Sequence, residues 1–252
     1  MNRLVQQMSS TPNRRRRPDP AAGEGSGAAR GSNCKNITIM KLPRYGALST
    51  RRDDVAMTTI RVHGWPVSTW TRTAAMTCIE KGAEYELVAL DRFSPEHYAL
   101  HPFGRMPVVE VGGLVLTETP AIACHLDECL GGPALQPEDL PTRTAMRRWM
   151  SICADYVFHD VVRAIPRGRP ASAEELAVAR TALERVESLV GDGPFLAGDG
   201  LTLADLFLAP QIANAREKAP EVLDGLGAIA AWAAGIEARE SFRRTAYDPA
   251  SV

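Results

Sequence analysis

The sequence contains no run of about 18 apolar residues, the length at which an α-helix can begin to cross a bilayer. It therefore predicts a protein that does not span a membrane. Hydrophobic residues make up 45% and charged residues 23% of its 252 residues, which is typical of soluble globular proteins. A chain of this length has room for one large domain or two small ones.

Cysteine is scarce, and its positions fit neither a disulfide framework nor a metal site. The chain has five cysteines, an odd number, with no Cys-x-x-Cys pair and no Cys/His ligand spacing. They are Cys34, Cys78, Cys124, Cys129 and Cys153. Scattered thiols of this kind are usually small buried side chains in proteins of a reducing compartment. We therefore expect a cytoplasmic protein that holds no metal ion.

The chain also lacks the excess of positive charge that is typical of nucleic-acid-binding proteins, since its formal net charge is −1. Residues 1–56 contain 11 Lys and Arg against 4 Asp and Glu, whereas the rest of the chain contains 18 against 26. The body of the protein is therefore mildly acidic. This disfavours nucleic acid as its main partner.

Residues 1–56 are poor in aromatic residues and rich in Gly, Pro, Ser and Arg, as in RRRRPDPAAGEGSGAARGS. Such a segment cannot bury enough apolar surface to offset its ordering entropy, so we expect a disordered basic extension. Three interpretations are open: a basic arm for nucleic acid or an anionic membrane, a targeting segment, or a passive tail upstream of an alternative start at Met57. We favour the last. A secretory signal is disfavoured, because no apolar segment lies beside the arginines.

Strand and helix patterns alternate over residues 57–131. The β-rich run TIRVH precedes the helical pattern STWTRTAAMTCIEKG, and the apolar run YELVAL follows as a buried strand. This order predicts a βαβ unit. PVVEVGGLVLTE predicts a hairpin that turns at Gly112 and Gly113, and TPAIACHLDECLGG predicts a closing helix. We therefore predict an α+β domain (βαβ followed by ββα) with a four-stranded mixed sheet.

Residues 140–252 show four helical patterns and no strand pattern, which predicts an all-helical second domain. The first pattern, TRTAMRRWMSICADYVFHDVVRAI, predicts one long helix. A later one, TLADLFLAPQIANAREK, is apolar nearly all round and is expected in the middle of the bundle. Its Thr202 and Asp205 match a capping box, in which each side chain bonds the backbone N–H of the other residue.

Three segments of the first domain bring polar groups to the sheet edge where open α/β sheets bind ligands. Ser68 begins a helix, whose unpaired N–H groups attract anions. Pro107 follows Met106 at the head of a strand, which leaves that backbone free to pair with an extended ligand. We expect the bond between them to be cis. Glu118 and Thr119 begin the next helix and can hold a carboxylate. Together they predict a site for a short, anionic, peptide-like ligand.

Each of these residues also has a purely structural explanation. Ser68 and Thr119 are suited to cap helices, Pro107 to end an edge strand, and Glu118 to be a surface acid. Their combination at one sheet edge favours the ligand site. If Ser68 contacts the ligand, we expect the neighbouring Thr69 to complete the end of the helix.

Three stretches of the chain match the motifs of a known enzyme family in order and spacing: RVHGWPVSTWTRT…CIEKGAEYELVALD, HPFGRMPVVEVGGLVLTETPAI and DGLTLADL. From about Ile60 to Arg244 the chain resembles the cytosolic glutathione S-transferases. It is most similar to phi-like serine-type enzymes of bacteria and plants, whose NPFGxVP and ES-x-AI motifs stand here as HPFGRMP and ETPAI. The resemblance implies a thioredoxin-like glutathione-binding domain, a helical domain, a homodimer and a role in detoxification.

The resemblance also implies roles for the residues at the sheet edge. Ser68 occupies the position of the catalytic serine, which donates a hydrogen bond to the glutathione sulfur and stabilises the thiolate. Met106, before Pro107, pairs its backbone with the cysteinyl part of glutathione. Glu118 and Thr119 hold the γ-glutamyl end. Glutathione is thus the implied co-substrate.

Two arginines stand where the family pattern is not matched. Arg105 occupies a position that is usually glutamine. The loop after the second strand is shorter than in plant phi enzymes and lacks the His-Lys pair that binds the glycyl carboxylate, so Arg92 is the candidate substitute. The cysteines that mark the beta and zeta classes of the family are absent.

The second substrate is expected between the two domains. Trp65 and Trp70 would border it on one side, and Tyr156 and His159 of the long helix on the other. Aromatic walls suit flat hydrophobic electrophiles.

The sequence leaves three functions open. The favoured one is a glutathione S-transferase that adds the thiolate to a hydrophobic electrophile. The second is another glutathione-dependent enzyme with the same site: an isomerase, a peroxidase or a dehalogenase. The third is a non-catalytic binding module of the same fold, which the shortened loop and the basic N-terminal segment would support.

Overall fold

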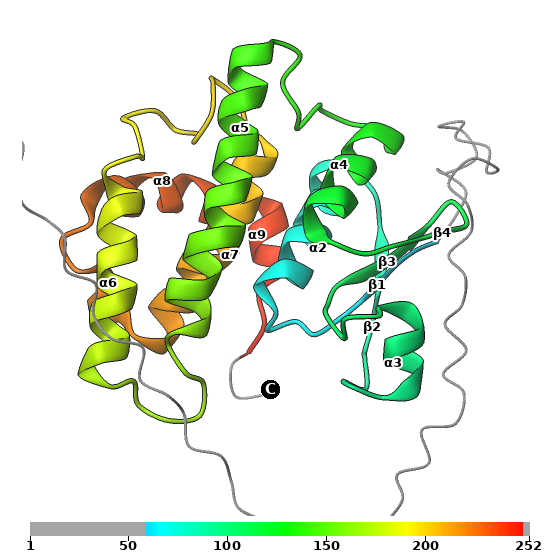
Figure 1. Ribbon diagram of the computed structural model, residues 1–252. Helices are drawn as coiled ribbons and strands as arrows, with labels where there is room; N and C mark the ends of the chain where they lie inside the picture. Colours follow the sequence, from blue (N-terminus) through cyan, green and yellow to red (C-terminus); the bar gives the residue numbers. More distant parts are fainter. Residues whose placement is uncertain (1–58, 249–252) are drawn as a thin grey trace, which may run out of the picture. The chain divides into compact units, whose positions relative to one another are not determined.

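A computed structural model describes residues 59–248, so the extension predicted at residues 1–56 lies outside the described residues. The described chain begins with a sheet region and continues as a helical region (Figure 1). None of the helices in this part of the chain is both long and apolar enough to cross a membrane. The four cysteines that fall within it form no disulfide bond with one another. The limits predicted for the two domains stay a prediction.

Four short strands form one mixed sheet in the order β2-β1-β3-β4. The strand β1 pairs in parallel with β2, as expected for a βαβ unit, and antiparallel with β3. The hairpin of β3 and β4 turns at Gly112 and Gly113, whose positive φ angles of 55° and 79° glycine adopts without a steric penalty. The strands are β1 (Ile60–His63), β2 (Tyr85–Val88), β3 (Val108–Val111) and β4 (Leu114–Leu116).

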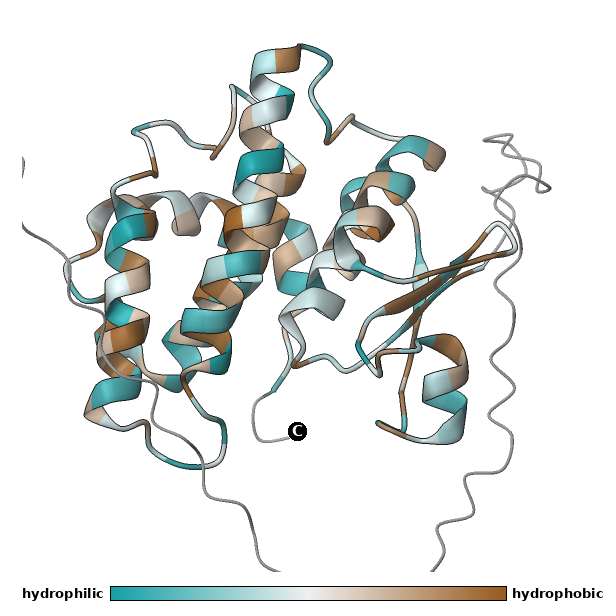
Figure 2. Ribbon diagram, in the orientation of Figure 1, coloured by the Kyte–Doolittle hydropathy of each residue, from teal (hydrophilic) through white to brown (hydrophobic). Residues whose placement is uncertain are grey.

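Three helices accompany the sheet: α2 (Thr69–Glu80), α3 (Pro95–Leu100) and α4 (Thr119–Cys129). Helices α2 and α4 pack against each other, and their apolar side chains form one core with the strands. In Figure 1 both lie between the sheet and the helical region, and Figure 2 shows the apolar colouring of the strands that they cover. The predicted thioredoxin-like arrangement is therefore confirmed, and the short helix α3 is an addition to it.

The rest of the described chain is helical, as predicted. Helix α7 lies at its centre: it packs against α2, α5, η1 and α8, and most of its side chains are buried. The expectation that this helix occupies the middle of the bundle is thus confirmed. The helices are α5 (Leu140–Ile152), η1 (Cys153–Arg163), α6 (Ala173–Glu187), α7 (Leu203–Lys218), η2 (Pro220–Leu223), α8 (Gly227–Glu237) and α9 (Glu240–Arg244).

The predicted long helix is one continuous helical stretch, but its second half, η1, is a π-helix. The buried residues Cys153, Val157 and Val161 of η1 are spaced by four, and Ile165, just beyond its end, continues this spacing. An apolar stripe with this spacing fits both an α-helix and the wider π-helix. The periodicity of the sequence therefore could not distinguish the two.

Asp205 joins three parts of the helical region. Its fully buried carboxylate accepts hydrogen bonds from the backbone N of Thr202, the backbone N of Leu196 and Nε1 of Trp232, each at 2.9 Å. The predicted contact between Asp205 and the start of α7 is therefore present. It also fixes the preceding loop and α8, since both supply donors to the same side chain.

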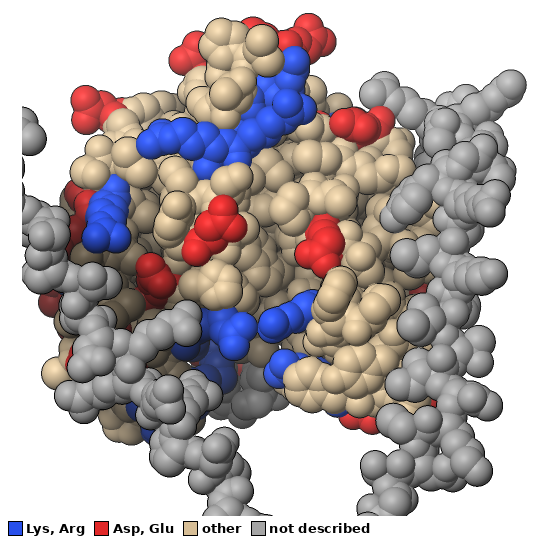
Figure 3. All heavy atoms as spheres, viewed as in Figure 1, with Lys and Arg blue, Asp and Glu red and all other residues tan. Residues whose placement is uncertain are grey.

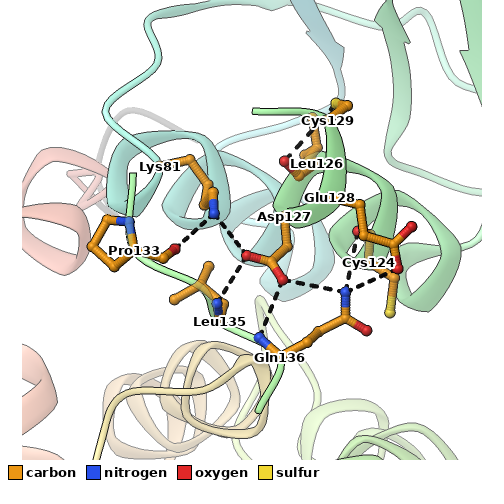
Figure 4. Close-up of polar contacts among 9 residues, drawn as sticks. All are labelled: Lys81, Cys124, Leu126, Asp127, Glu128, Cys129, Pro133, Leu135 and Gln136. Carbon is orange, nitrogen blue, oxygen red and sulfur yellow. Dashed lines mark hydrogen bonds and ion pairs between the residues drawn. The ribbon is translucent and has the colours of Figure 1, made fainter. Parts of the chain in front are cut away.

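A buried ion pair anchors the connection between the two regions (Figure 4). Nζ of Lys81, at the end of α2, lies 2.9 Å from Oδ1 of Asp127 on α4 and donates to the carbonyl of Pro133 at 2.6 Å. Asp127 also accepts from the backbone N atoms of Leu135 and Gln136. Because both charges are buried and each also bonds the backbone of the connector, the pair holds the connector against α2 and α4.

Two further contacts join α2 to the helical region. The hydroxyl of Thr73 donates to the carbonyl of Leu206 on α7 at 3.0 Å. The carboxylate of Glu80 accepts from Arg239 at 2.7 and 2.8 Å and from the hydroxyl of Ser241. Helix α2 is therefore fixed along its length, and its N-terminus faces the cavity described next.

Candidate active site

Ser68 forms the N-cap of α2. Its Oγ accepts a hydrogen bond from the backbone N of Thr71 at 3.3 Å, and its carbonyl accepts from the backbone N of Arg72 at 3.0 Å. The expectation that Thr69 completes the helix end is wrong, because Thr69 is already helical and its buried hydroxyl has no hydrogen-bond partner among residues 59–248. A serine hydroxyl that accepts one bond keeps its own hydrogen to donate, so capping leaves Ser68 able to contact a ligand.

The loop before β3 is held by a buried histidine. The bond between Met106 and Pro107 is cis, as predicted. Nδ1 of His97 accepts from the backbone N of Phe93 at 3.1 Å, so the proton is on Nε2, which donates to the carbonyl of Arg105 at 2.8 Å. His97 therefore fixes the main chain immediately before Met106. The sequence offered a signal for α3, since Ser94 followed by Pro95 is a helix start.

Glu118 and Thr119 lie at the start of α4. Glu118 has φ 67° and ψ 107°, a conformation that residues other than glycine rarely adopt. No side chain caps this end of the helix, and Thr119 is buried. Strained backbone of this kind is concentrated at functional sites. The free N–H groups of α4 are therefore available to an anion.

His101 is a buried side chain of this site that the sequence analysis did not single out. Its Nε2 lies 3.7 Å from Oε1 of Glu118, and its Nδ1 accepts from the backbone N of Phe103 at 3.3 Å. Burial lowers the pKa of His101 although the Glu118 carboxylate acts to raise it. The neutral ring therefore directs its N–H toward Glu118. Its position as the first residue of the HPFG motif was the signal in the sequence that could have identified it.

Trp65 and Arg92 stand together at the cavity's edge. Nε1 of Trp65 donates to the carbonyl of Leu90 at 2.8 Å, which fixes the ring. The guanidinium of Arg92 lies 5.4 Å from the centre of that ring and 4.5 Å from that of Phe93. These are cation–π distances. Arg92 is exposed and makes no ion pair with residues 59–248, so its charge is available to a ligand.

A cavity of about 570 Å³ brings these segments together with η1 and α7. All the predicted site residues except Tyr156 line it. They are Trp65, Ser68, Trp70, Arg92, Arg105, Met106, Pro107, Glu118, Thr119 and His159. The structure thus gathers residues from five separate stretches of the sequence around one space.

Tyr156 lies outside this cavity, and its side chain is 60% exposed. The lining face of η1 carries Ala154, Phe158 and Val162, and residue 156 falls midway between two of them, on another side of the helix. The aromatic partner of Trp70 is Phe158 instead, with 5.1 Å between the ring centres. Phe158 lies four residues after Ala154, and this helical spacing was the signal in the sequence that could have identified it.

The helical side of the cavity is basic. Arg163, Arg167 and Lys218 line it, and none of them was singled out from the sequence. Nζ of Lys218 donates to the carbonyls of Val162 and Ile165 at 2.8 and 2.9 Å. Burial, followed by the nearby Arg167, lowers the pKa of Lys218 to about 8. Figure 3 shows Lys and Arg side chains on both sides of the hollow at the lower centre of the molecule.

Among residues 59–248, no group of three or more His, Cys, Asp or Glu side chains is arranged to hold a metal ion. The polar groups of the cavity include hydroxyls, free helix N-termini and five cationic side chains, against one carboxylate, that of Glu118. Hydroxyls, helix N-termini and cations bind and stabilise anions. A thioredoxin-like sheet with a cis-proline loop beside such a helix start, joined to a helical bundle, defines a class of proteins whose cavity suits a short, anionic, peptide-like ligand.

Comparison with known proteins narrows this class. Residues 58–128 match the family model of the glutathione S-transferase N-terminal domain, and residues 169–235 match that of the C-terminal domain. Glutathione S-transferase 4 of Zea mays is 31% identical over 216 residues, which cover 76% of this chain and 94% of that protein. The chain therefore belongs to the glutathione S-transferase family. It is a glutathione transferase with relatives in the plant phi class.

Solved structures share the fold. Poplar glutathione transferase F1 matches with a TM-score of 0.65 and 23% identity, covering 75% of this chain and 96% of the poplar chain. A glutathione S-transferase from Methylobacillus flagellatus KT, solved with GSH bound, also has a TM-score of 0.65 and 23% identity. That match covers 75% of this chain and the whole of the other.

Proposed function

We propose that this enzyme activates glutathione with Ser68 and transfers the thiolate to an electrophile bound against Trp70 and Phe158. The observation that carries the proposal is the position of Ser68. Its hydroxyl lies at the N-terminus of α2 and lines the same cavity as the main chain of Met106 and the free start of α4.

Glutathione fits this arrangement in one direction. The γ-glutamyl carboxylate lies at the start of α4 beside Thr119, and the γ-glutamyl ammonium lies near Glu118. The cysteinyl part pairs with the main chain of Met106. The glycyl carboxylate then falls on the side of Arg92 and Arg105, the two cations of the sheet region that line the cavity. In this position the sulfur points toward Ser68.

The chemistry follows from the charge of the thiolate. A thiol with a pKa of about 8.5 becomes largely ionised near neutral pH when a helix N-terminus and a hydroxyl donor stabilise the anion. The thiol proton leaves to solvent, and the sulfur attacks the electrophile directly. The protein forms no covalent bond to either substrate.

Kinetics of Ser68→Ala test this proposal. A hydrogen bond to a charged group contributes roughly 1.5–3 kcal/mol, so kcat/KM for thiol conjugation should fall about 10- to 100-fold. Ser68→Thr keeps a hydroxyl and should recover part of the loss. Ser172→Ala is the matched control, because Ser172 also caps a helix, α6, but lies outside the cavity.

Both alanine variants remove an N-cap, so their thermal stabilities should fall by similar amounts, whereas only Ser68→Ala should lose activity. Full activity in Ser68→Ala would show that another donor stabilises the thiolate. Equal loss of activity in the two variants would show that the effect is one of stability.

We further propose that the enzyme is a cytoplasmic homodimer, as is typical of its family. Native mass spectrometry should give a mass twice that of the chain. A monomeric mass at micromolar concentration would contradict this.

A further inference from the structure

The helical half of the cavity carries a cluster of three cationic side chains, Arg163, Arg167 and Lys218. Arg163 is the last residue of η1, and Arg167 lies in the bend that follows it; both line the same cavity. Lys218 is the last residue of α7, which packs against η1. The cluster therefore forms one end of the space in which the second substrate binds.

Nearby acids neutralise only part of this cluster. Glu118 is the one acidic residue among those that line the cavity, and it lies at the glutathione end. Glu217 pairs with Arg167 at 2.6 Å, but it does not line the cavity. Arg163 makes no ion pair with any residue in 59–248. The helical end of the cavity therefore has a net positive charge.

The environment of Lys218 agrees with this excess of charge. Its ammonium is held by the carbonyls of Val162 and Ile165. Carbonyls supply partial negative charge but no counter-ion. Burial, and then the neighbouring Arg167, lower its pKa to about 8 although Glu217 acts to raise it, and an anion bound beside it would raise that pKa further.

Asn214 is a polar residue with an unpaired side-chain oxygen at the same end of the cavity. It lines the cavity one turn before Lys218 on α7, is 5% exposed, and its buried Oδ1 has no hydrogen-bond partner among residues 59–248. A buried polar atom without a partner is costly. Because the amide can turn to present either its oxygen or its NH₂ group, it can bond a polar group of a ligand.

Apart from His159, the remainder of this half is apolar. Trp70 and Phe158 form an aromatic wall, with 5.1 Å between their ring centres, and Ala154 and Val162 continue the lining of η1. The space therefore offers a flat apolar surface with a basic, hydrogen-bonding end. The basic end is an addition to the aromatic walls for a flat hydrophobic electrophile that the sequence predicted.

We propose that the second substrate is an amphipathic electrophile: a flat apolar body that lies against Trp70 and Phe158, and an anionic group such as a carboxylate that faces Arg163 and Lys218. This inference rests on the proposed function, because it places the two carboxylates of glutathione elsewhere, at the start of α4 and beside Arg92. The basic helical end then has no other anion to bind.

An activated alkene illustrates the reaction. The thiolate sulfur forms a bond to the β-carbon of an aryl enone, and the π electrons shift toward the carbonyl oxygen. A proton from solvent then adds at the α-carbon and balances the one that the thiol released. The anionic group takes no part in this step and serves only to bind and orient the substrate.

The test uses the full-length enzyme and two aryl enones that differ in one group, a para-carboxylate in one and a para-carboxamide in the other. Each enzymatic kcat/KM is divided by the rate constant of the uncatalysed reaction with glutathione. The wild type should prefer the carboxylate about tenfold on this scale. Arg163→Gln should lower the carboxylate value about fivefold, and Arg163→Glu by more than tenfold, while the carboxamide value changes less than twofold.

Arg163 suits this test because its replacement breaks no ion pair within the described residues. Arg163→Lys keeps the charge and should retain most of the preference. Arg148→Gln is the matched control, since it removes the same charge from the same long helical stretch outside the cavity. It should alter neither value.

Equal normalised values for the two enones in the wild type, or equal effects of Arg163→Gln on both, would overturn the inference and leave the transferase function standing. Absence of conjugation with either enone, although calorimetry shows that glutathione binds, would overturn the proposed function and this inference with it. A carboxylate preference that survives Arg163→Glu would assign the anion to another part of the cavity and overturn the role of the cluster.

Discussion

The two halves of the cavity are built from different chemical groups. In the sheet half, the proposed contacts to glutathione come largely from the main chain: the start of α2 at Ser68, the backbone of Met106 beside the cis proline, and the free start of α4. In the helical half, side chains of η1 and α7 form the lining, among them Phe158, Arg163 and Lys218.

Because of this difference, the binding of each of the two substrates can be altered separately. A site made of backbone groups depends on fold geometry and tolerates few changes, which suits a ligand that never changes. A site made of side chains on packed helices can be altered one residue at a time without moving the main chain. Variants of the sheet half should therefore affect glutathione, and variants of the helical half the electrophile.

Thr119→Val is expected to separate the effects on the two substrates most strongly. This change removes a hydroxyl at the start of α4 and keeps the volume, so the KM for glutathione should rise about tenfold through loss of a bond to a carboxylate. The preference between electrophiles should not change. Steady-state kinetics with each substrate varied in turn measures both quantities. Thr181→Val on α6 is the control, since its hydroxyl contacts only the carbonyl of Ala177.

The converse effect is expected from Phe158→Ala. Loss of the ring that packs against Trp70 should raise the KM for an aryl electrophile about fivefold and leave that for glutathione within twofold. Phe158→Leu restores apolar bulk and should give an intermediate value. An equal rise in both KM values would show that the two halves are not separable in the way described.

A smaller effect, on stability, is expected at Glu80, where α2 of the sheet region contacts the helical region. Burial acts to raise the pKa of Glu80, but hydrogen bonds from Arg239 and Ser241 outweigh it, so the pKa is lowered overall. A lowered acid pKa stabilises the fold at neutral pH, and this contribution is lost as the pH falls through that pKa. Glu80→Gln should therefore reduce the free energy of unfolding by about 1 kcal/mol at neutral pH.

Denaturant titrations at several pH values check this. The difference between wild type and Glu80→Gln should disappear in strong acid, below the usual pKa of a glutamate. A difference that does not depend on pH would show that the ion pair with Arg239 contributes nothing. Neither substrate's KM should change more than twofold at neutral pH, because Glu80 lies outside the cavity.

Local signals in the sequence predicted the sheet half well. The fold class, the βαβ unit and the cis bond before Pro107 are each confirmed, because glycines, prolines and short apolar runs fix such features within a few residues. Two details were missed. The hydroxyl of Ser68 caps α2, so the prediction that Thr69 completes the helix end is wrong. The buried rings of His97, which holds the loop before Met106, and of His101, which lines the cavity, were not predicted.

The helical half was predicted less well, for a physical reason. Arg163 and Lys218 are 55 positions apart in the sequence, and only the packing of α7 against η1 brings them to one cavity. Helical periodicity gives the face of a residue relative to its own helix but not which neighbour that face meets. This is why Tyr156 was placed at the site in preference to Phe158.

The central claim is that Ser68 stabilises the glutathione thiolate. The most direct test is an ultraviolet titration of the thiol of enzyme-bound glutathione, carried out in the wild type and in Ser68→Ala. The account predicts a bound pKa at least one unit below the ordinary value of about 8.5 in the wild type, and a return most of the way to that value in the variant. The same lowered pKa in both proteins would contradict it.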